Sequence, residues 1–209
     1  MGHGVPVVGS LLDVDLERLA QARPDLVLVQ RTVSGPPAGL TEAARRQGWR
    51  VAEVPCTTLQ DVRDLESAVR QAVGDAGSAT QTEARWSRVL RPLADAPGQS
   101  PVVLLFGVDP PQAFGAGTYL ADVWAAWGGR CLPDAAGHPS LRMEDLSSMP
   151  LRGLWVVGGA AADAPGLQVL ASRGVAVRRA PDPALLRPGP QLLEAVEAWR
   201  SALESGVRP

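Results

Sequence analysis

The chain contains no lysine, isoleucine or asparagine, so arginine supplies all 20 of its basic residues. We interpret this bias as the product of a GC-rich genome rather than as a sign of phosphate recognition. The formal net charge of −2 provides no positive field for nucleic acid, and nucleic-acid binding is therefore disfavoured. No apolar run approaches the roughly 18 residues that a transmembrane helix needs, so we expect no membrane-spanning segment.

Cysteine and histidine are equally scarce. Cys56 and Cys131 match no metal-binding spacing, and each lies beside a predicted strand, which is typical of a small buried hydrophobic residue. The two histidines, His3 and His138, have no HxxxH or HxxE partner, and the chain has no GxSxG, Walker or CxxC motif. We therefore expect no catalytic residues, no cofactor and no resident metal, and hence a protein that is not an enzyme.

Short apolar runs alternate with amphipathic stretches along most of the chain. This alternation predicts βαβ units and a fold of the α/β class, with mainly parallel sheets flanked by helices. The predicted strands cover residues 5–8, 26–30, 51–54, 102–107, 154–158 and 175–178.

Residues 59–96 interrupt this rhythm with two helical patterns and no strand. The patterns cover residues 59–73 and about 82–95, on either side of a glycine-containing break at 74–77. We interpret the segment as a helical connector between two lobes. The predicted division is an N-terminal lobe over 1–58, a connector over 59–97 and a C-terminal lobe over 98–209.

Helical spacing also predicts a helix that begins after Thr118 and ends before Gly128, and a last helix that begins near residues 188–190. Their apolar faces include Trp124, Trp127 and Trp199, which we interpret as core residues rather than as ligand platforms.

Two glycine pairs leave an enzymatic alternative open. Gly115 and Gly117 precede a predicted helix, where backbone N–H groups could bind an anion, although the third glycine of a dinucleotide fingerprint is missing. Gly158 and Gly159 follow a predicted strand. A Rossmann-like, nucleotide-dependent enzyme is therefore one alternative interpretation.

Several segments resemble the class III, helical-bridge solute-binding proteins of ABC importers, especially the branch that binds cobalamin and siderophores. They occur in family order and span nearly the whole chain. The matching segments are residues 15–19 with 23–29, residues 106–111 with 115–120 and 127–129, residues 138–144 with 154–158, and residues 182–190.

The resemblance implies a protein that binds cobalamin, haem or a ferric siderophore in a cleft between lobes and delivers it to a permease. It also implies that Glu17 and Glu144, one on each lobe, pair with arginines of the permease. From the residues alone, each could equally complement a helix macrodipole. The implied ligand-binding residues are Gln30, Arg31, Phe106, Gly107, Phe114, His138, Asp182 and Arg187.

The family normally carries about forty further residues before this chain's first residue, and their loss would expose a strand edge. The resemblance implies a periplasmic or extracytoplasmic location. The chain itself shows no signal peptide, which leaves a cytoplasmic location open. A shortened cytosolic paralogue that binds cobalamin without transporting it is therefore the second alternative.

Overall fold

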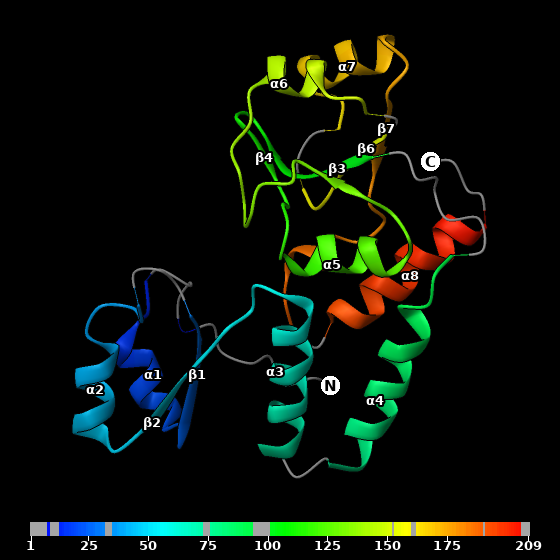
Figure 1. The fold of residues 1–209 in the computed structure, drawn as a ribbon. Helices are drawn as coiled ribbons and strands as arrows, with labels where there is room; N and C mark the ends of the chain where they lie inside the picture. The colour runs from blue at the N-terminus through cyan, green and yellow to red at the C-terminus, as the bar shows by residue number, and fades with distance from the viewer. Residues whose placement is uncertain are drawn as a thin grey trace. The chain divides into compact units, whose positions relative to one another are not determined.

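The computed structural model describes residues 8, 13–31, 35–72, 76–93, 101–151, 153–159, 162–189 and 191–205. The chain divides into two compact units, Met1–Cys56 and Thr57–Pro209 (Figure 1). The predicted strand at 5–8 lies outside the described residues except for Val8, which is not in a strand.

The first unit contains two parallel strands and two helices. The strands are β1 (Leu26–Gln30) and β2 (Arg50–Val54), and the helices are α1 (Leu16–Ala22) and α2 (Leu40–Gln47). Asp15 caps α1 by accepting a hydrogen bond from the Arg18 N–H at 3.0 Å, and Gly48 ends α2 in the left-handed conformation.

The second unit is built on a five-stranded sheet. Its strand order is β4-β3-β6-β7, and β5 pairs with β3. All pairings are parallel except that of β4 with β3. The strands are β3 (Val102–Val108), β4 (Pro111–Ala113), β5 (Cys131–Leu132), β6 (Gly153–Val156) and β7 (Ala176–Arg179). The predicted α/β class is confirmed.

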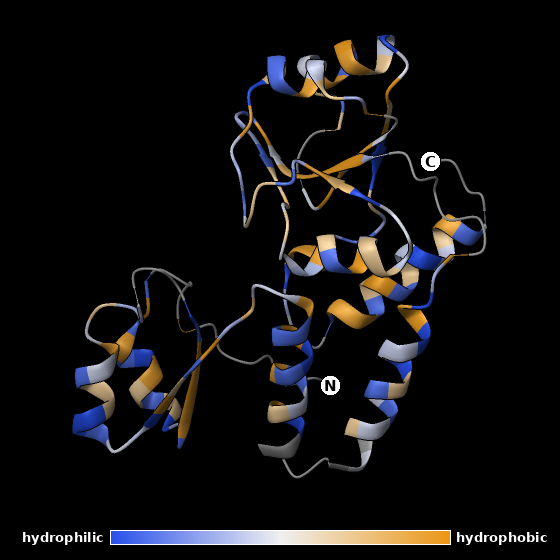
Figure 2. Ribbon diagram, in the orientation of Figure 1, coloured by the Kyte–Doolittle hydropathy of each residue, from blue (hydrophilic) through white to orange (hydrophobic). Residues whose placement is uncertain are grey.

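Helices cover both faces of this sheet. Figure 1 shows α6 (Met143–Ser148) and α7 (Pro165–Ser172) on one side, and α5 (Tyr119–Ala126) and α8 (Leu192–Glu204) on the other. Apolar residues run along β3 (Figure 2). Successive β3 residues enter opposite cores: Val102 and Leu104 join one buried cluster, and Val103 and Leu105 join the other. Because this strand is buried on both faces, its sequence is a continuous run of apolar residues.

The predicted helices of the 59–96 segment are α3 (Leu59–Ala72) and α4 (Ala76–Val89). The predicted boundaries of the second helix were wrong, because the helix begins and ends six residues earlier than expected. Gly77 belongs to its first turn, where a glycine disturbs a helix less than in the interior. Both helices bury residues in the core that also contains β3, while their role as a connector stays a prediction.

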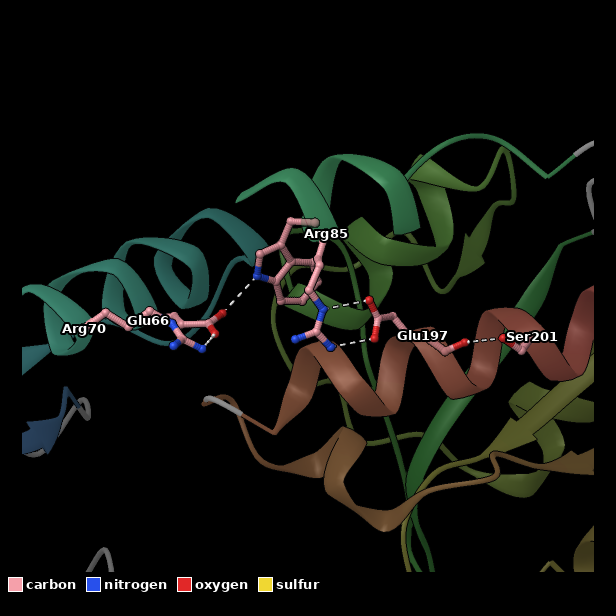
Figure 3. A network of polar contacts seen from close by, with 6 residues as sticks. Glu66, Arg70, Arg85, Glu197 and Ser201 are labelled. Carbon is pink, nitrogen blue, oxygen red and sulfur yellow. Dashed lines mark hydrogen bonds and ion pairs between the residues drawn. The ribbon is translucent and has the colours of Figure 1, made fainter. Parts of the chain in front are cut away.

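Polar contacts fasten these two helices to each other and to α8 (Figure 3). The Glu66 carboxylate, which is 2% exposed, accepts a hydrogen bond from Trp86 Nε1 and pairs with Arg70 Nη2, each at 3.0 Å. Arg85 donates two hydrogen bonds to the Glu197 carboxylate, at 3.1 Å from Nε and 2.7 Å from Nη2. This geometry holds three helices in a fixed register.

Trp124, Trp127 and Trp199 are core residues, as predicted. Trp199 of α8 lies at ring-centroid distances of 5.5 Å from Trp124, 5.3 Å from Trp127 and 5.5 Å from Trp155. The indoles of Trp124, Trp127 and Trp199 are fully buried, so none of the three offers a face to a ligand.

Candidate functional site

Three of the predicted ligand-binding residues form one aromatic group in the second unit. The ring centroids of Phe106 and Phe114 lie 5.0 Å apart, and each lies 5.4 Å from that of His138. All three pairs meet edge to face, the arrangement that aromatic quadrupoles favour. Phe114 is buried, Phe106 is half-buried and His138 is exposed. We call these three residues the aromatic trio.

The strand pairing of the sheet positions the trio. Phe106 lies near the end of β3, and Phe114 directly follows β4, which folds back beside β3. The loop that carries His138 lies against this hairpin through backbone hydrogen bonds from Gly115 N to Gly137 O at 2.8 Å and from Ala113 N to Pro139 O at 3.0 Å. Segments distant in sequence therefore present their rings together.

Tyr119 connects the trio to a second predicted segment. Its ring lies 5.6 Å from that of Phe114, and its hydroxyl donates a hydrogen bond to the Leu185 carbonyl at 2.9 Å. Leu185 belongs to the short 3₁₀ helix η1 (Pro183–Leu186), which Asp182 precedes and Arg187 follows. Sequence reasoning missed this role of Tyr119, although it is the only tyrosine of the chain.

The two charged residues that flank η1 differ in their local roles. Asp182 caps the 3₁₀ helix, since its side chain accepts a hydrogen bond from the Ala184 N–H at 2.7 Å. Arg187 is exposed and follows the last turn. Arg187 is therefore the residue of this loop that is free to meet an anionic group from solvent.

Although the His138 side chain is exposed, its packing against Phe106 and Phe114 removes part of its hydration, and this partial desolvation lowers its pKa below the ordinary value because it disfavours the charged imidazolium. A lowered pKa favours the neutral imidazole, which keeps a lone pair on one ring nitrogen. Within the described part of the chain, no three His, Cys, Asp or Glu side chains are grouped so that they could hold a metal ion.

The remaining predicted ligand residues lie in other places. Gly107 follows Phe106 in β3, and a side chain at this position would come within 3.3 Å of the Gln112 side chain. Gln30 ends β1 of the first unit, and Arg31 N–H donates to the Val54 carbonyl at 2.8 Å. Both Gln30 and Arg31 are exposed, and their role in binding stays a prediction.

One glycine of each pair, Gly115 and Gly158, has a steric explanation. A Cβ at Gly115 would lie 2.0 Å from the Ala135 carbonyl oxygen, and one at Gly158 would lie 2.2 Å from Leu186 Cδ1. The first N–H of α5, that of Tyr119, donates to the Thr57 carbonyl at 2.7 Å, and the Thr118 hydroxyl donates to Gly115 O at 2.7 Å instead of capping the helix. The helix start is therefore already engaged by protein groups.

The predicted docking glutamates both lie in the first turn of a helix, Glu17 in α1 and Glu144 in α6, and both are exposed. In each helix a neighbouring aspartate performs the capping. Asp15 caps α1, and Asp145 accepts hydrogen bonds from the backbone N–H of Arg142 at 3.0 Å and from its guanidinium. In the described residues, no hydrogen bond or ion pair engages either glutamate, so neither is needed to cap its helix.

No family model and no curated protein matches the chain, but solved structures do. The heme-binding protein HutB of Vibrio cholerae superimposes with a TM-score of 0.72 at 18% identity, over 95% of this chain and 84% of that one. A possible iron-binding protein of Staphylococcus epidermidis gives 0.70 at 16%, over 92% and 81%. The vitamin B12 binding protein BtuF of Vibrio cholerae gives 0.66 at 18%, over 95% and 81%.

All three similar proteins are described as periplasmic, and the likeness extends over nearly all of this chain. At identities this low, it establishes the fold. The chain has the fold of the class III periplasmic solute-binding proteins, and the resemblance noted in the sequence is confirmed at that level. None of the described helices combines the length and apolar character required to cross a membrane.

Proposed function

We propose that this chain is the solute-binding component of an ABC-type importer, which binds cobalamin or a related metal chelate outside the cytoplasm and delivers it to a permease. The observation that carries the proposal is the aromatic trio, in which exposed His138 lies beside half-buried Phe106, on a fold that solute-binding proteins share. In this role the protein binds and releases a solute without bond chemistry.

The chemistry of the trio favours a flat, metal-centred solute. The half-buried ring of Phe106, backed by the buried ring of Phe114, supplies apolar surface that suits a tetrapyrrole or corrin. The neutral imidazole of His138 offers a lone pair to an axial metal position. Arg187, on the loop joined to the trio through Tyr119, suits the carboxylate or phosphate of such a solute. Cobalamin comes first in this proposal, followed by haem and then a ferric siderophore.

Spectroscopic titration of the full chain with cyanocobalamin, haemin and a ferric catecholate tests the proposal. We expect the absorption bands of one of these solutes to shift at saturation. We further expect Phe106→Leu and His138→Gln to weaken that binding by about tenfold or more, an amount worth about 1.4 kcal/mol or more. Val169→Ala, at an exposed position on α7, is the matched control and should bind normally. The absence of a shift with all three solutes would overturn the proposal.

The docking part of the proposal rests on Glu17 and Glu144. Each is an exposed carboxylate that makes no hydrogen bond or ion pair among the described residues, and each can therefore accept a charge-assisted hydrogen bond from an arginine of the permease. We expect Glu17→Gln and Glu144→Gln to reduce the stimulation of a reconstituted importer's ATPase while solute affinity is unchanged. Glu194→Gln, at an exposed position on α8, is the control. Normal stimulation by both variants would contradict this part.

A further inference from the structure

The outer edge of β1 is unpaired in the part of the chain that the structure describes, where β1 pairs with β2 alone. At one end of this parallel pair, the Asp25 carbonyl accepts a hydrogen bond from the Arg50 N–H at 3.0 Å. At the other end, the Arg31 N–H donates to the Val54 carbonyl at 2.8 Å. Because the backbone groups of successive strand residues point to opposite sides, alternate residues from Asp25 to Arg31 face β2.

The intervening residues Leu26, Leu28 and Gln30 direct their backbone N–H and C=O groups to the outer edge. None of the residues of β1 is charged. Leu28 lies in the middle of the strand and is 41% exposed, although leucine is one of the residues most often buried. The edge is therefore a row of backbone donors and acceptors around an exposed apolar side chain, which favours pairing with another strand.

The other edge strands have features that oppose such pairing. β2 contains the exposed charged residues Arg50 and Glu53, and β7, at one end of the second sheet, ends in Arg178 and Arg179. β4 is only three residues long and begins with Pro111, which has no backbone N–H, and β5 has two residues. Charges, proline and very short length are common protections of a sheet edge, and β1 has none of them.

We infer that the outer edge of β1 pairs antiparallel with the same edge of a second copy of this chain. The sequence is self-complementary when the two-fold axis passes beside Leu28. Leu28 then lies opposite Leu28 of the second copy, and Leu26 lies opposite Gln30. At each end, Asp25 of one copy lies opposite Arg31 of the other. Both side chains are exposed, and opposite charges in directly facing positions stabilise a strand pair.

This register satisfies the backbone and the side chains of the edge together. Leu26, Leu28 and Gln30 fall at hydrogen-bonded positions, so each outward N–H and C=O gains a partner. The two exposed Leu28 side chains meet on one face. The two-stranded sheets of both copies join into one four-stranded sheet, and three or more strands are stable where two are marginal. The pairing needs no solute and is independent of the proposed function.

Sedimentation velocity of the full chain over a dilution series tests the pairing. We expect the wild type to shift from monomer to dimer as its concentration rises. Leu28→Arg should raise the dimer dissociation constant about tenfold or more, because it places two like charges face to face. Val169→Arg, at an exposed apolar position on α7, is the matched control and should dimerise like the wild type. A wild type that stays monomeric throughout, or equal effects of the two variants, would overturn the inference.

Charge reversal tests the register without changing an apolar side chain. Asp25→Arg places like charges opposite each other at both ends of the strand pair and should weaken dimerisation. Within one copy, positions 25 and 31 are about 20 Å apart along the strand, too far for direct contact. Adding Arg31→Asp should therefore restore dimerisation only if the two positions meet between copies. If the double variant is as weak as Asp25→Arg, the antiparallel register is wrong.

Disulfide capture locates the two-fold axis. Leu28→Cys should form a cross-linked dimer under mild oxidation, because position 28 faces itself at a separation that a disulfide can span. Leu26→Cys, on the same face and edge, faces position 30 and should stay monomeric on a non-reducing gel. Neither native cysteine is exposed, so neither should compete. Equal cross-linking of the two variants would rule out pairing centred on Leu28.

Discussion

The two units of the chain differ in the size of their sheets and in how much apolar surface they bury. In the second unit, helices cover both faces of a five-stranded sheet, and two clusters of fully buried residues lie against it. In the first unit, the sheet has two strands and the described buried side chains are small in number and size: Leu19, Leu40, Ala43, Ala44 and Cys56.

This difference indicates that the two units differ in their free energies of unfolding. A two-stranded sheet is marginal by itself, because it buries too little apolar surface to offset the entropy of ordering. The second unit buries enough aromatic and aliphatic side chains to form a cooperative core. We therefore expect the first unit to open at lower denaturant than the second, and mutations in the two units to separate these transitions.

The largest effect should follow from Trp199→Ala in the second unit. Trp199 is fully buried and contacts three other tryptophans, so its removal leaves a large cavity and should cost about 3–5 kcal/mol. Urea denaturation followed by near-ultraviolet circular dichroism measures the loss. Trp49→Ala, at a half-buried position in the first unit, is the control. Equal losses for the two variants would contradict the comparison.

Leu40→Ala should act on the first unit alone. Leu40 is completely buried at the start of α2, and the substitution should cost about 2–5 kcal/mol. Hydrogen exchange should then show faster exchange of the β1 and β2 amides, while those of β3 and β6 keep their protection. A matching loss of protection in β3 would show that the two units fold as one and would end the comparison.

A smaller effect is expected for Glu66→Ala, which tests whether α3 and α4 belong to the stable core. The substitution leaves the buried Trp86 indole N–H without its acceptor, at a cost of about 1–3 kcal/mol. Glu83→Ala removes the more exposed partner of Arg63 on the same helix pair and should cost about 0–1 kcal/mol. The urea midpoint for unfolding of the second unit measures both losses. Equal losses for the two variants would show that the buried Glu66 carboxylate stabilises the helix pair no more than the exposed Glu83 does.

The smallest effect should be a pH dependence confined to the second unit. Because the pKa of His138 is lowered from 6.5 in the folded chain, the unfolded chain takes up the proton more readily. The associated stability is fully present above pH 6.5 and is lost as the pH falls from there through the folded-state pKa. Comparison of wild type with His138→Gln between pH 5 and 8 should show a shallower acid-side decline in the variant. Identical profiles would contradict the assignment.

Hydrophobic patterning predicted most of the architecture correctly. The runs at 26–30, 51–54, 102–107, 154–158 and 175–178 all correspond to strands to within one or two residues at most ends. A strand buried on both faces can only be apolar throughout, which is why β3 was easy to recognise. The short strands β4 and β5 were missed, because three and two residues carry no periodicity.

The candidate site was harder to predict in detail. Sequence resemblance selected Phe106, Phe114 and His138, but only the pairing of β3 with β4 and the backbone contacts of the 137–139 loop bring their rings together. The sequence left Asp13 and Asp15 as alternative caps for the first helix, and hydrogen-bond geometry identifies Asp15; the capping role of Asp145 was not predicted. That geometry is what separates the two capping aspartates from Glu17 and Glu144.

Neither native cysteine is exposed, which makes the chain convenient for site-directed labelling. Cys56 is buried, and desolvation, with a smaller contribution from the charge of Asp122, raises the pKa of Cys131 to about 12, so little reactive thiolate exists near neutral pH. A cysteine introduced at an exposed position of each unit should therefore react with a spin label or fluorophore in the otherwise native sequence. Distances between such labels, recorded with and without cargo, would report directly on any motion between the units.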